Sequence, residues 1–123
     1  MTAADTAGSD TGGLFAAIDN KDAASFVQYL AEDAVFRFGS APPVRGRAAI
    51  REAVDGFFAT IAGCRHAIGN SLRSGRTLVC EGEVTYRRHD DSEITLPFTN
   101  VFEYQGKLIA HYKIYIDIGP LYA

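Results

Sequence analysis

Hydrophobic spacing changes near Arg65 and divides the chain into two unlike parts. Before this point, apolar residues recur at helical spacing, which predicts helices at 14–20, after an N-cap at Asp22, and over 47–61. A short strand is expected at 34–38. After Arg65, alternating residues between short polar turns predict four strands, at about 65–73, 76–88, 93–104 and 107–117. Helices followed by an antiparallel meander predict an α+β fold, with the helices on one face of a strongly curved, mostly antiparallel sheet.

The last predicted strand sorts its side chains into two sets, because successive strand residues point to opposite faces. One set is apolar throughout: Leu108, Ala110, Tyr112, Ile114 and Ile116. The other set carries an imidazole, an amine, a phenol and a carboxylate: Ile109, His111, Lys113, Tyr115 and Asp117. This polar set faces either water or a pocket.

Turn lengths predict which residues oppose each other across the sheet. Turns at Ser74-Gly75, 89–92 and Gln105-Gly106 give three rows on one face: Ile68, Glu81, Asn100 and His111; His66, Glu83, Phe98 and Lys113; and Thr85, Leu96 and Tyr115. Polar groups ringed by apolar side chains are typical of a small-molecule site. A bulge in one strand would exchange its two faces.

The opposite face of the predicted sheet is more uniformly apolar. It holds Cys80, Gly82, Val84, Tyr86, Val101, Ala110, Tyr112, Ile114 and Ile116. Because helices cover only one face, we expect a second subunit to cover this one, in a homodimer formed through the outer sheet face.

Composition narrows the class of protein. The 123 residues fit one domain, expected over 13–123 after a flexible tail at 1–12. The net charge of −3 argues against nucleic acid or a membrane surface as partner. No apolar run is long enough to span a bilayer, and the N-terminus resembles no secretory signal. The two cysteines fit no metal spacing, and we expect no metal or cofactor. We expect the cysteines to stay reduced, as in a cytoplasmic protein.

His111 is the leading candidate for a catalytic acid or base, because an imidazole titrates nearest neutral pH. In the predicted rows it lies beside Asn100 and near Glu81, either of which could fix its tautomer. The alternative is a partly buried histidine with satisfied hydrogen bonds. His66 with Glu83 is either a second dyad of this kind or a surface pair.

Other candidates have structural alternatives as well. Lys113 with Glu83 is either an electrophilic clamp or a structural ion pair. Tyr115 either donates its hydroxyl to a substrate or walls the pocket. The apolar wall is predicted from one leucine and five phenylalanines: Leu96, Phe36, Phe38, Phe58, Phe98 and Phe102.

Three segments resemble the SnoaL-like proteins of the nuclear transport factor 2-like superfamily. They are DNKDAASFVQYLAEDAVFRF (19–38), VRGRAAIREAVDGFF (44–58) and NVFEYQGKLIAHYKIYID (100–117). The resemblance implies a cone-shaped α+β barrel with a pocket inside, in a protein that is usually dimeric. Relatives include ketosteroid isomerases, limonene epoxide hydrolases, scytalone dehydratases and polyketide cyclases.

The catalytic residues of these relatives are not matched as a set at the corresponding positions of this sequence. The tyrosine and base of ketosteroid isomerase fall near Leu14 and Phe38, and its oxyanion-hole acid falls near Asn100. The three positions of the limonene epoxide hydrolase triad are occupied here by Glu83, by Thr85 and by either Lys113 or Ile114.

Three functions therefore stay open. The first is a cofactor-independent enzyme that moves protons on a small apolar oxygenated molecule, in an isomerisation, cyclisation or dehydration. The second is a non-catalytic small-molecule-binding or assembly domain. The third is an epoxide hydrolase, in which Glu83 would have to activate water.

Overall fold

The computed structural model describes the backbone of residues 2–123 and the side chains of residues 11–123. Its helical part comprises α1 (Thr2–Asp19), α2 (Ala23–Phe26), the 3-10 turn η1 (Val27–Tyr29), α3 (Arg47–Ala59) and the short α4 (Gly119–Tyr122). Its strands are β1 (Leu30–Phe38), β2 (Val44–Arg45), β3 (Gly63–Ser74), β4 (Thr77–Arg87), β5 (Glu93–Gln105) and β6 (Leu108–Tyr115).

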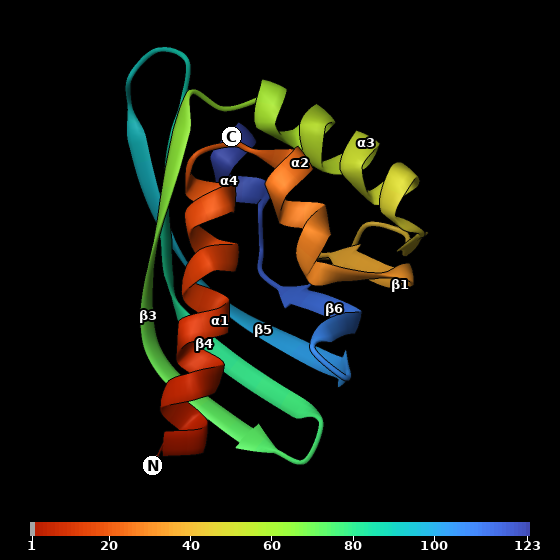
Figure 1. Ribbon diagram of the computed structural model, residues 1–123. Coiled ribbons are helices and arrows are strands. Elements are labelled where there is room, and N and C mark those ends of the chain that lie inside the picture. The colour runs from red at the N-terminus through yellow and green to blue at the C-terminus, as the bar shows by residue number, and fades with distance from the viewer. Residues whose placement is uncertain (1) are drawn as a thin grey trace.

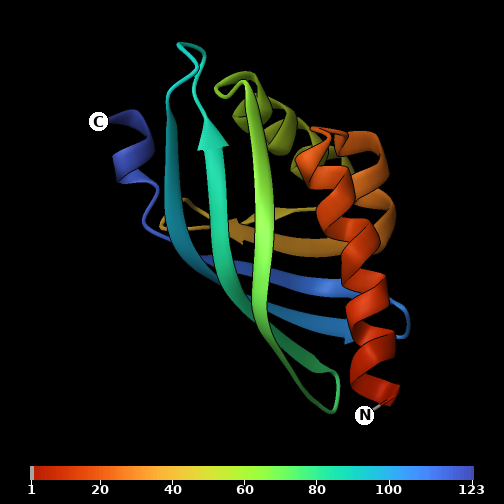
Figure 2. The same cartoon turned by 90° about the vertical axis from the view of Figure 1, so that its left-hand side faces the viewer.

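The strands form one mixed sheet in the order β2-β1-β6-β5-β4-β3. Only β1 and β6 run parallel; every other neighbouring pair is antiparallel. The sheet curls strongly around the helices without closing, as Figures 1 and 2 show. The predicted α+β class, with helices packed on a curved sheet, is confirmed.

Local signals place the starts of α2 and α3 correctly. Asp22 caps α2, with its side chain accepting a hydrogen bond from the Ser25 amide at 3.1 Å. Gly46 precedes α3 at a φ of 91°, a conformation that favours glycine. The first helix begins at Thr2 and so includes most of the segment 1–12 that we expected to be a tail. The flexibility of that segment stays a prediction.

Tyr112 lies at the centre of an aromatic cluster between sheet and helices. Its ring centroid is 4.6 Å from that of Phe102, 5.2 Å from that of Phe36 and 5.7 Å from that of Phe26. The α3 stripe of Ile50, Val54 and Phe58 closes the same side of the core. The contacts with Phe102 and Phe36 are edge-to-face, an arrangement that adds to the stability from burial alone.

The observed register differs from the predicted rows at all three hairpins. Val84 opposes Leu96 across β4 and β5, where Thr85 was predicted, because the connecting loop has five residues rather than four. A bulge near Gly69 shifts β3 against β4. A Cβ on Gly82 would collide with the Ala67 carbonyl, so the bulged pair requires glycine there.

The most consequential difference is in β6. Tyr104 opposes Ile109 and Glu103 opposes His111, so Ala110 is an extra, bulged residue. This bulge lets both Ile109 and Tyr112 point inward, although they are three residues apart. Beyond the bulge, every side chain of β6 faces the side opposite to the predicted one.

Several residues that we predicted on the outer, dimer-forming face of the sheet therefore lie on its inner face. Cys80, Val84 and Tyr112 are each at most 1% exposed and belong to the interior beneath the helices. The outer face carries Glu81, Glu83, Glu103 and Lys113 instead. Dimerisation itself stays a prediction.

Candidate functional site

A cavity of about 200 Å³ lies between the concave face of the sheet and the helices. Phenylalanines from β1, α3 and β5 make up much of its wall. The loop after β1 and an exposed part of α3 border it through Ala41, Pro42 and Ala53. The full lining is Ile18, Phe26, Phe36, Phe38, Ala41, Pro42, Val44, Ala53, Val54, Phe57, Phe58, His66, Val84, Tyr86, Phe98, Asn100, Tyr112, Ile114 and Ile116.

Four polar side chains interrupt this apolar lining: His66 on β3, Tyr86 on β4, Asn100 on β5 and Tyr112 on β6. Of the described residues that line the cavity, none is an aspartate, glutamate, lysine or arginine. His66 is therefore the one basic side chain among the described residues of this lining.

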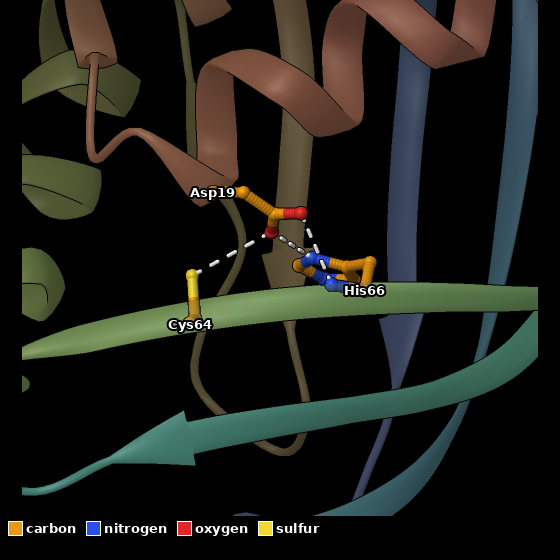
Figure 3. A group of neighbouring side chains, drawn as sticks. All are labelled: Asp19, Cys64 and His66. Atoms are coloured by element: carbon orange, nitrogen blue, oxygen red, sulfur yellow. Dashed lines mark hydrogen bonds and ion pairs between the residues drawn. The ribbon is translucent and has the colours of Figure 1, made fainter.

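Asp19 holds His66 from outside the lining. The Nδ1 atom of His66 lies 2.6 Å from Oδ1 of Asp19, and the His66 amide donates to Oδ2 at 3.1 Å (Figure 3). The chain turns sharply after the helix, with Lys21 at a φ of 54°. Because Asp19 is the last residue of α1, its carboxylate reaches β3 at the point where helix and strand meet.

The His66 ring also packs between two aromatic rings. Its centroid is 5.0 Å from Phe15 and 5.3 Å from Phe98. The side chain is 10% exposed. The ring and the backbone amide of His66 each bond to the same carboxylate, and together with the two ring contacts these bonds hold the imidazole in one orientation, as acid–base catalysis requires.

Two buried polar atoms in the lining lack a protein partner. No described group hydrogen bonds to Oδ1 of Asn100 or to the hydroxyl of Tyr112. Both residues lie on the inner face of adjacent strands, at diagonal positions of the β5–β6 ladder. Burial raises the pKa of the Tyr112 phenol well above its usual value, so this group is a neutral donor.

Cys64 lies beside the dyad. Its Sγ is 3.5 Å from the Ile18 carbonyl oxygen and 3.8 Å from Oδ1 of Asp19. Burial, with the Asp19 carboxylate as a second cause, raises the pKa of this thiol to about 12. Burial likewise raises the pKa of Tyr86. The thiol is therefore neutral and weakly nucleophilic near pH 7.

The bulge at Ala110 places several predicted site residues outside the cavity. His111, Lys113 and Tyr115 are exposed on the outer face, Tyr115 at 57%. They border a separate outer hollow of about 510 Å³ between β1 and β6. The prediction that His111 shares a pocket with Asn100 is wrong, because the two side chains lie on opposite faces of the sheet.

The pairings predicted for Glu83 are also wrong. Glu83 is exposed on the outer face opposite Pro97, while Lys113 opposes Val101. His66 therefore has Asp19 as its carboxylate partner rather than Glu83. An epoxide hydrolase that relies on Glu83 to activate water has no support in this arrangement.

Among the predicted site residues, His66 and Asn100 both line the cavity. Four of the predicted wall residues line it as well: Phe36, Phe38, Phe58 and Phe98. Phe102 and Leu96 are buried in the core behind it. Sequence reasoning missed Asp19 and Tyr112: the first is 47 residues from its partner, and the second was assigned to the wrong face.

The fold and cavity define a cone-like α+β domain with a partly open, largely apolar cavity between sheet and helices. A family model described as SnoaL-like domain matches residues 12–112. The chain therefore belongs to the SnoaL-like domain family. No curated protein matched the chain. No helix within residues 2–123 is long and apolar enough to cross a lipid bilayer.

Solved structures share this fold at low sequence identity. An NTF2-like protein of unknown function from Burkholderia pseudomallei is 16% identical, with a TM-score of 0.83 over 92% of both chains. A hypothetical protein from Catenulispora acidiphila, with a ketosteroid isomerase-like fold and solved with trimethylamine, is 16% identical (TM-score 0.80, 86% of this chain and 83% of that one). An LEH-like epoxide hydrolase from M. tuberculosis is also 16% identical (TM-score 0.75, 89% and 80%).

Proposed function

We propose that this protein is an enzyme that moves protons on a small, uncharged, largely apolar molecule bearing oxygen, without a cofactor. His66 acts as the acid or base, Asp19 orients it, and Asn100 with Tyr112 holds the polar end of the substrate. The observation that carries this proposal is an imidazole fixed by a carboxylate at 2.6 Å on the wall of an apolar cavity.

The Asp19 contact decides which nitrogen of His66 reacts. A carboxylate accepts hydrogen bonds, so the imidazole proton resides on Nδ1 and Nε2 keeps its lone pair. When Nε2 takes a proton from substrate, the nearby carboxylate stabilises the imidazolium that forms. A positioned base of this kind contributes roughly 10²–10⁴-fold to the rate.

The two polar atoms without a partner indicate which hydrogen-bonding group the substrate carries. Tyr112 is a donor and Oδ1 of Asn100 is an acceptor, and a hydroxyl or enol can satisfy both at once. Leaving either atom unpaired costs about 1–3 kcal/mol, which a substrate oxygen would recover on binding. A developing oxyanion would gain more from the Tyr112 donor than a neutral carbonyl does.

Cavity volume limits the size of the substrate. An apolar cavity of roughly 150 Å³ accommodates a benzene-sized molecule. The observed volume of about 200 Å³ therefore suits a single ring or a small bicyclic molecule rather than a steroid. A lining without permanently charged side chains favours a neutral ligand.

Family membership supports a reaction or binding event in the cavity and leaves its type open. Structural neighbours include an LEH-like epoxide hydrolase and a protein solved with trimethylamine, at identities that establish the fold alone. Isomerisation, cyclisation or dehydration each needs a base at one end of the substrate and a donor at the other. His66 and Tyr112 meet that need.

Deuterium exchange tests the proposal without knowledge of the natural substrate. A panel of neutral cyclic ketones, enones and phenols is first screened for binding by thermal shift. Binders are then incubated with the protein in D₂O, and exchange at acidic C–H positions is followed by NMR. We expect wild-type protein and His111→Gln to catalyse exchange, and His66→Gln to lose about 10²–10⁴-fold of the rate.

His111→Gln is the matched control because His111 is exposed on the outer face. An unchanged exchange rate in His66→Gln would remove His66 from the mechanism. Tight binders without any exchange would instead identify a non-catalytic small-molecule-binding domain.

A further inference from the structure

We propose that Asp19, Cys64 and His66 form a binding site for a thiophilic divalent cation such as Zn²⁺. The site is built where the end of α1 meets the start of β3 (Figure 3). A carboxylate oxygen, a sulfur and an imidazole nitrogen from these residues lie within 4.8 Å of one another. Cation binding here goes beyond the proposed catalytic function and does not depend on it.

The donor set matches the coordination chemistry of zinc. Zinc is bound in proteins by cysteine sulfur, histidine nitrogen and carboxylate oxygen, commonly in a tetrahedron. Bond lengths of about 2.0–2.3 Å place neighbouring ligand atoms roughly 3.5 Å apart. Sγ of Cys64 and Oδ1 of Asp19 are already 3.8 Å apart, while Oδ1 and Nδ1 of His66, at 2.6 Å, would separate by less than about 1 Å.

Backbone geometry keeps the three ligands together. Cys64 and His66 are two residues apart on one strand, so both side chains point to the same face. The His66 amide and its ring both bond to Asp19, which ties the carboxylate to the strand. Because all three ligands are partly buried, little side-chain freedom is lost when an ion binds.

The charges of the ligands balance the charge of the ion. Asp19 carries one negative charge, and Cys64 would carry a second once its thiol proton leaves. The His66 proton moves from Nδ1 to Nε2, so that neutral imidazole coordinates through Nδ1. Each bound ion therefore releases one proton to solvent, and two anionic ligands neutralise a divalent cation.

Three protein ligands leave a fourth tetrahedral position free. Catalytic and labile zinc sites have this arrangement, whereas structural sites use four protein ligands. If the proposed function is correct, a bound ion would occupy the Asp19–His66 dyad and stop proton transfer. That consequence rests on the proposed function, whereas cation binding is measured without any substrate.

Titration of the intact protein with Co²⁺, a spectroscopic substitute for zinc, tests the site. We expect saturable binding of one ion per chain, with a thiolate-to-cobalt charge-transfer band in the near ultraviolet that Zn²⁺ abolishes by competition. Cys64→Ser should remove the band, and Asp19→Asn should weaken binding by at least about tenfold. Absence of saturable Co²⁺ binding to wild-type protein would overturn the proposal.

Cys80→Ala provides the matched control. Cys80 is a fully buried thiol whose Sγ lies 3.4 Å from the hydroxyl of Ser71 rather than beside a histidine or a carboxylate. The cobalt band should persist in Cys80→Ala; its loss there, or its survival in Cys64→Ser, would contradict the site.

A second measurement covers the case in which the Cys64 variant fails to fold. Wild-type protein is alkylated with and without Zn²⁺, and each cysteine is followed by peptide mass spectrometry. We expect Zn²⁺ to slow alkylation of Cys64 at least about tenfold, since a metal-bound thiolate is shielded. Equal alkylation rates with and without Zn²⁺ would also overturn the proposal.

Discussion

Asp19, at the end of α1, and His66, on β3, meet through two bonds, one to the imidazole at 2.6 Å and one to the backbone amide at 3.1 Å. The carboxylate thus fixes both the position of the strand and the orientation of the ring. A residue that serves the packing of helix on sheet also determines which nitrogen of the imidazole contacts a carboxylate.

The tautomer of His66 can be measured directly. We expect Nδ1 to carry the proton in wild-type protein, with the ring nitrogens assigned by ¹⁵N NMR. Asp19→Asn offers an amide that can donate to Nδ1, so the proton should move to Nε2. The exchange rate described above should then fall by about 10²–10⁴-fold. An Nε2-protonated ring in the wild type would contradict the assigned role of Asp19.

The variant Tyr112→Phe should affect the stability of the fold and the affinity for a ligand differently. The Tyr112 hydroxyl has no described protein partner, so its removal should leave the free energy of unfolding unchanged or raise it by about 1 kcal/mol. Affinity for a hydroxyl-bearing ligand should fall roughly tenfold, because each 1.4 kcal/mol corresponds to a factor of ten. Urea unfolding and calorimetric titration give the two quantities. A large loss of stability would mean that the hydroxyl is satisfied within the free protein.

Access to the cavity can be narrowed from α3. Ala53 is exposed yet lines the cavity, so a phenylalanine there should obstruct it while changing the free energy of unfolding by no more than about 0.5 kcal/mol. Ligand binding by Ala53→Phe, measured by calorimetry, should weaken at least about tenfold. Ala49→Phe is the matched control, because Ala49 is exposed on the same helix and lies outside the lining. Similar losses in both variants would contradict a cavity entrance at Ala53.

Alkaline pH should destabilise the fold through Cys64. Its pKa in the folded protein is raised from 9.0 to about 12, so the unfolded chain loses this proton first. The stabilising contribution is complete below about pH 9 and disappears as the pH rises toward 12, with a slope of at most about 1.4 kcal/mol per pH unit. Urea unfolding between pH 8 and 10.5 should show falling stability, with a shallower slope in Cys64→Ala. Equal slopes would show that Cys64 titrates normally.

Local sequence signals predicted the elements well. Asp22 as an N-cap and the apolar stripe of α3 act over one or two helical turns, and both are present as expected. The order of helices before strands likewise predicted the α+β class. The parallel pairing of β1 with β6 was not predicted, because it joins segments separated by most of the chain.

Register could not be obtained from turn lengths, because bulges form where packing favours them. In β6, Ile109 and Tyr112 are both apolar but three residues apart, which strict alternation cannot bury together. That spacing was the available signal for a bulge at Ala110. The Asp19–His66 contact carried no local signal, since the two residues meet only when α1 packs on β3.

The bulge at Ala110 makes backbone pairing, as much as residue identity, decide which side chains face the interior. If Ala110 instead paired regularly with Glu103, the rest of β6 would turn over, presenting His111 and Lys113 to the aromatic interior and expelling Tyr112, whereas deleting Ala110 would remove the bulge and keep the present faces. Within this architecture, the presence or absence of one bulge can thus exchange the groups that surround a ligand more completely than any point substitution, and an alignment that misplaces one gap would compare inner residues with outer ones.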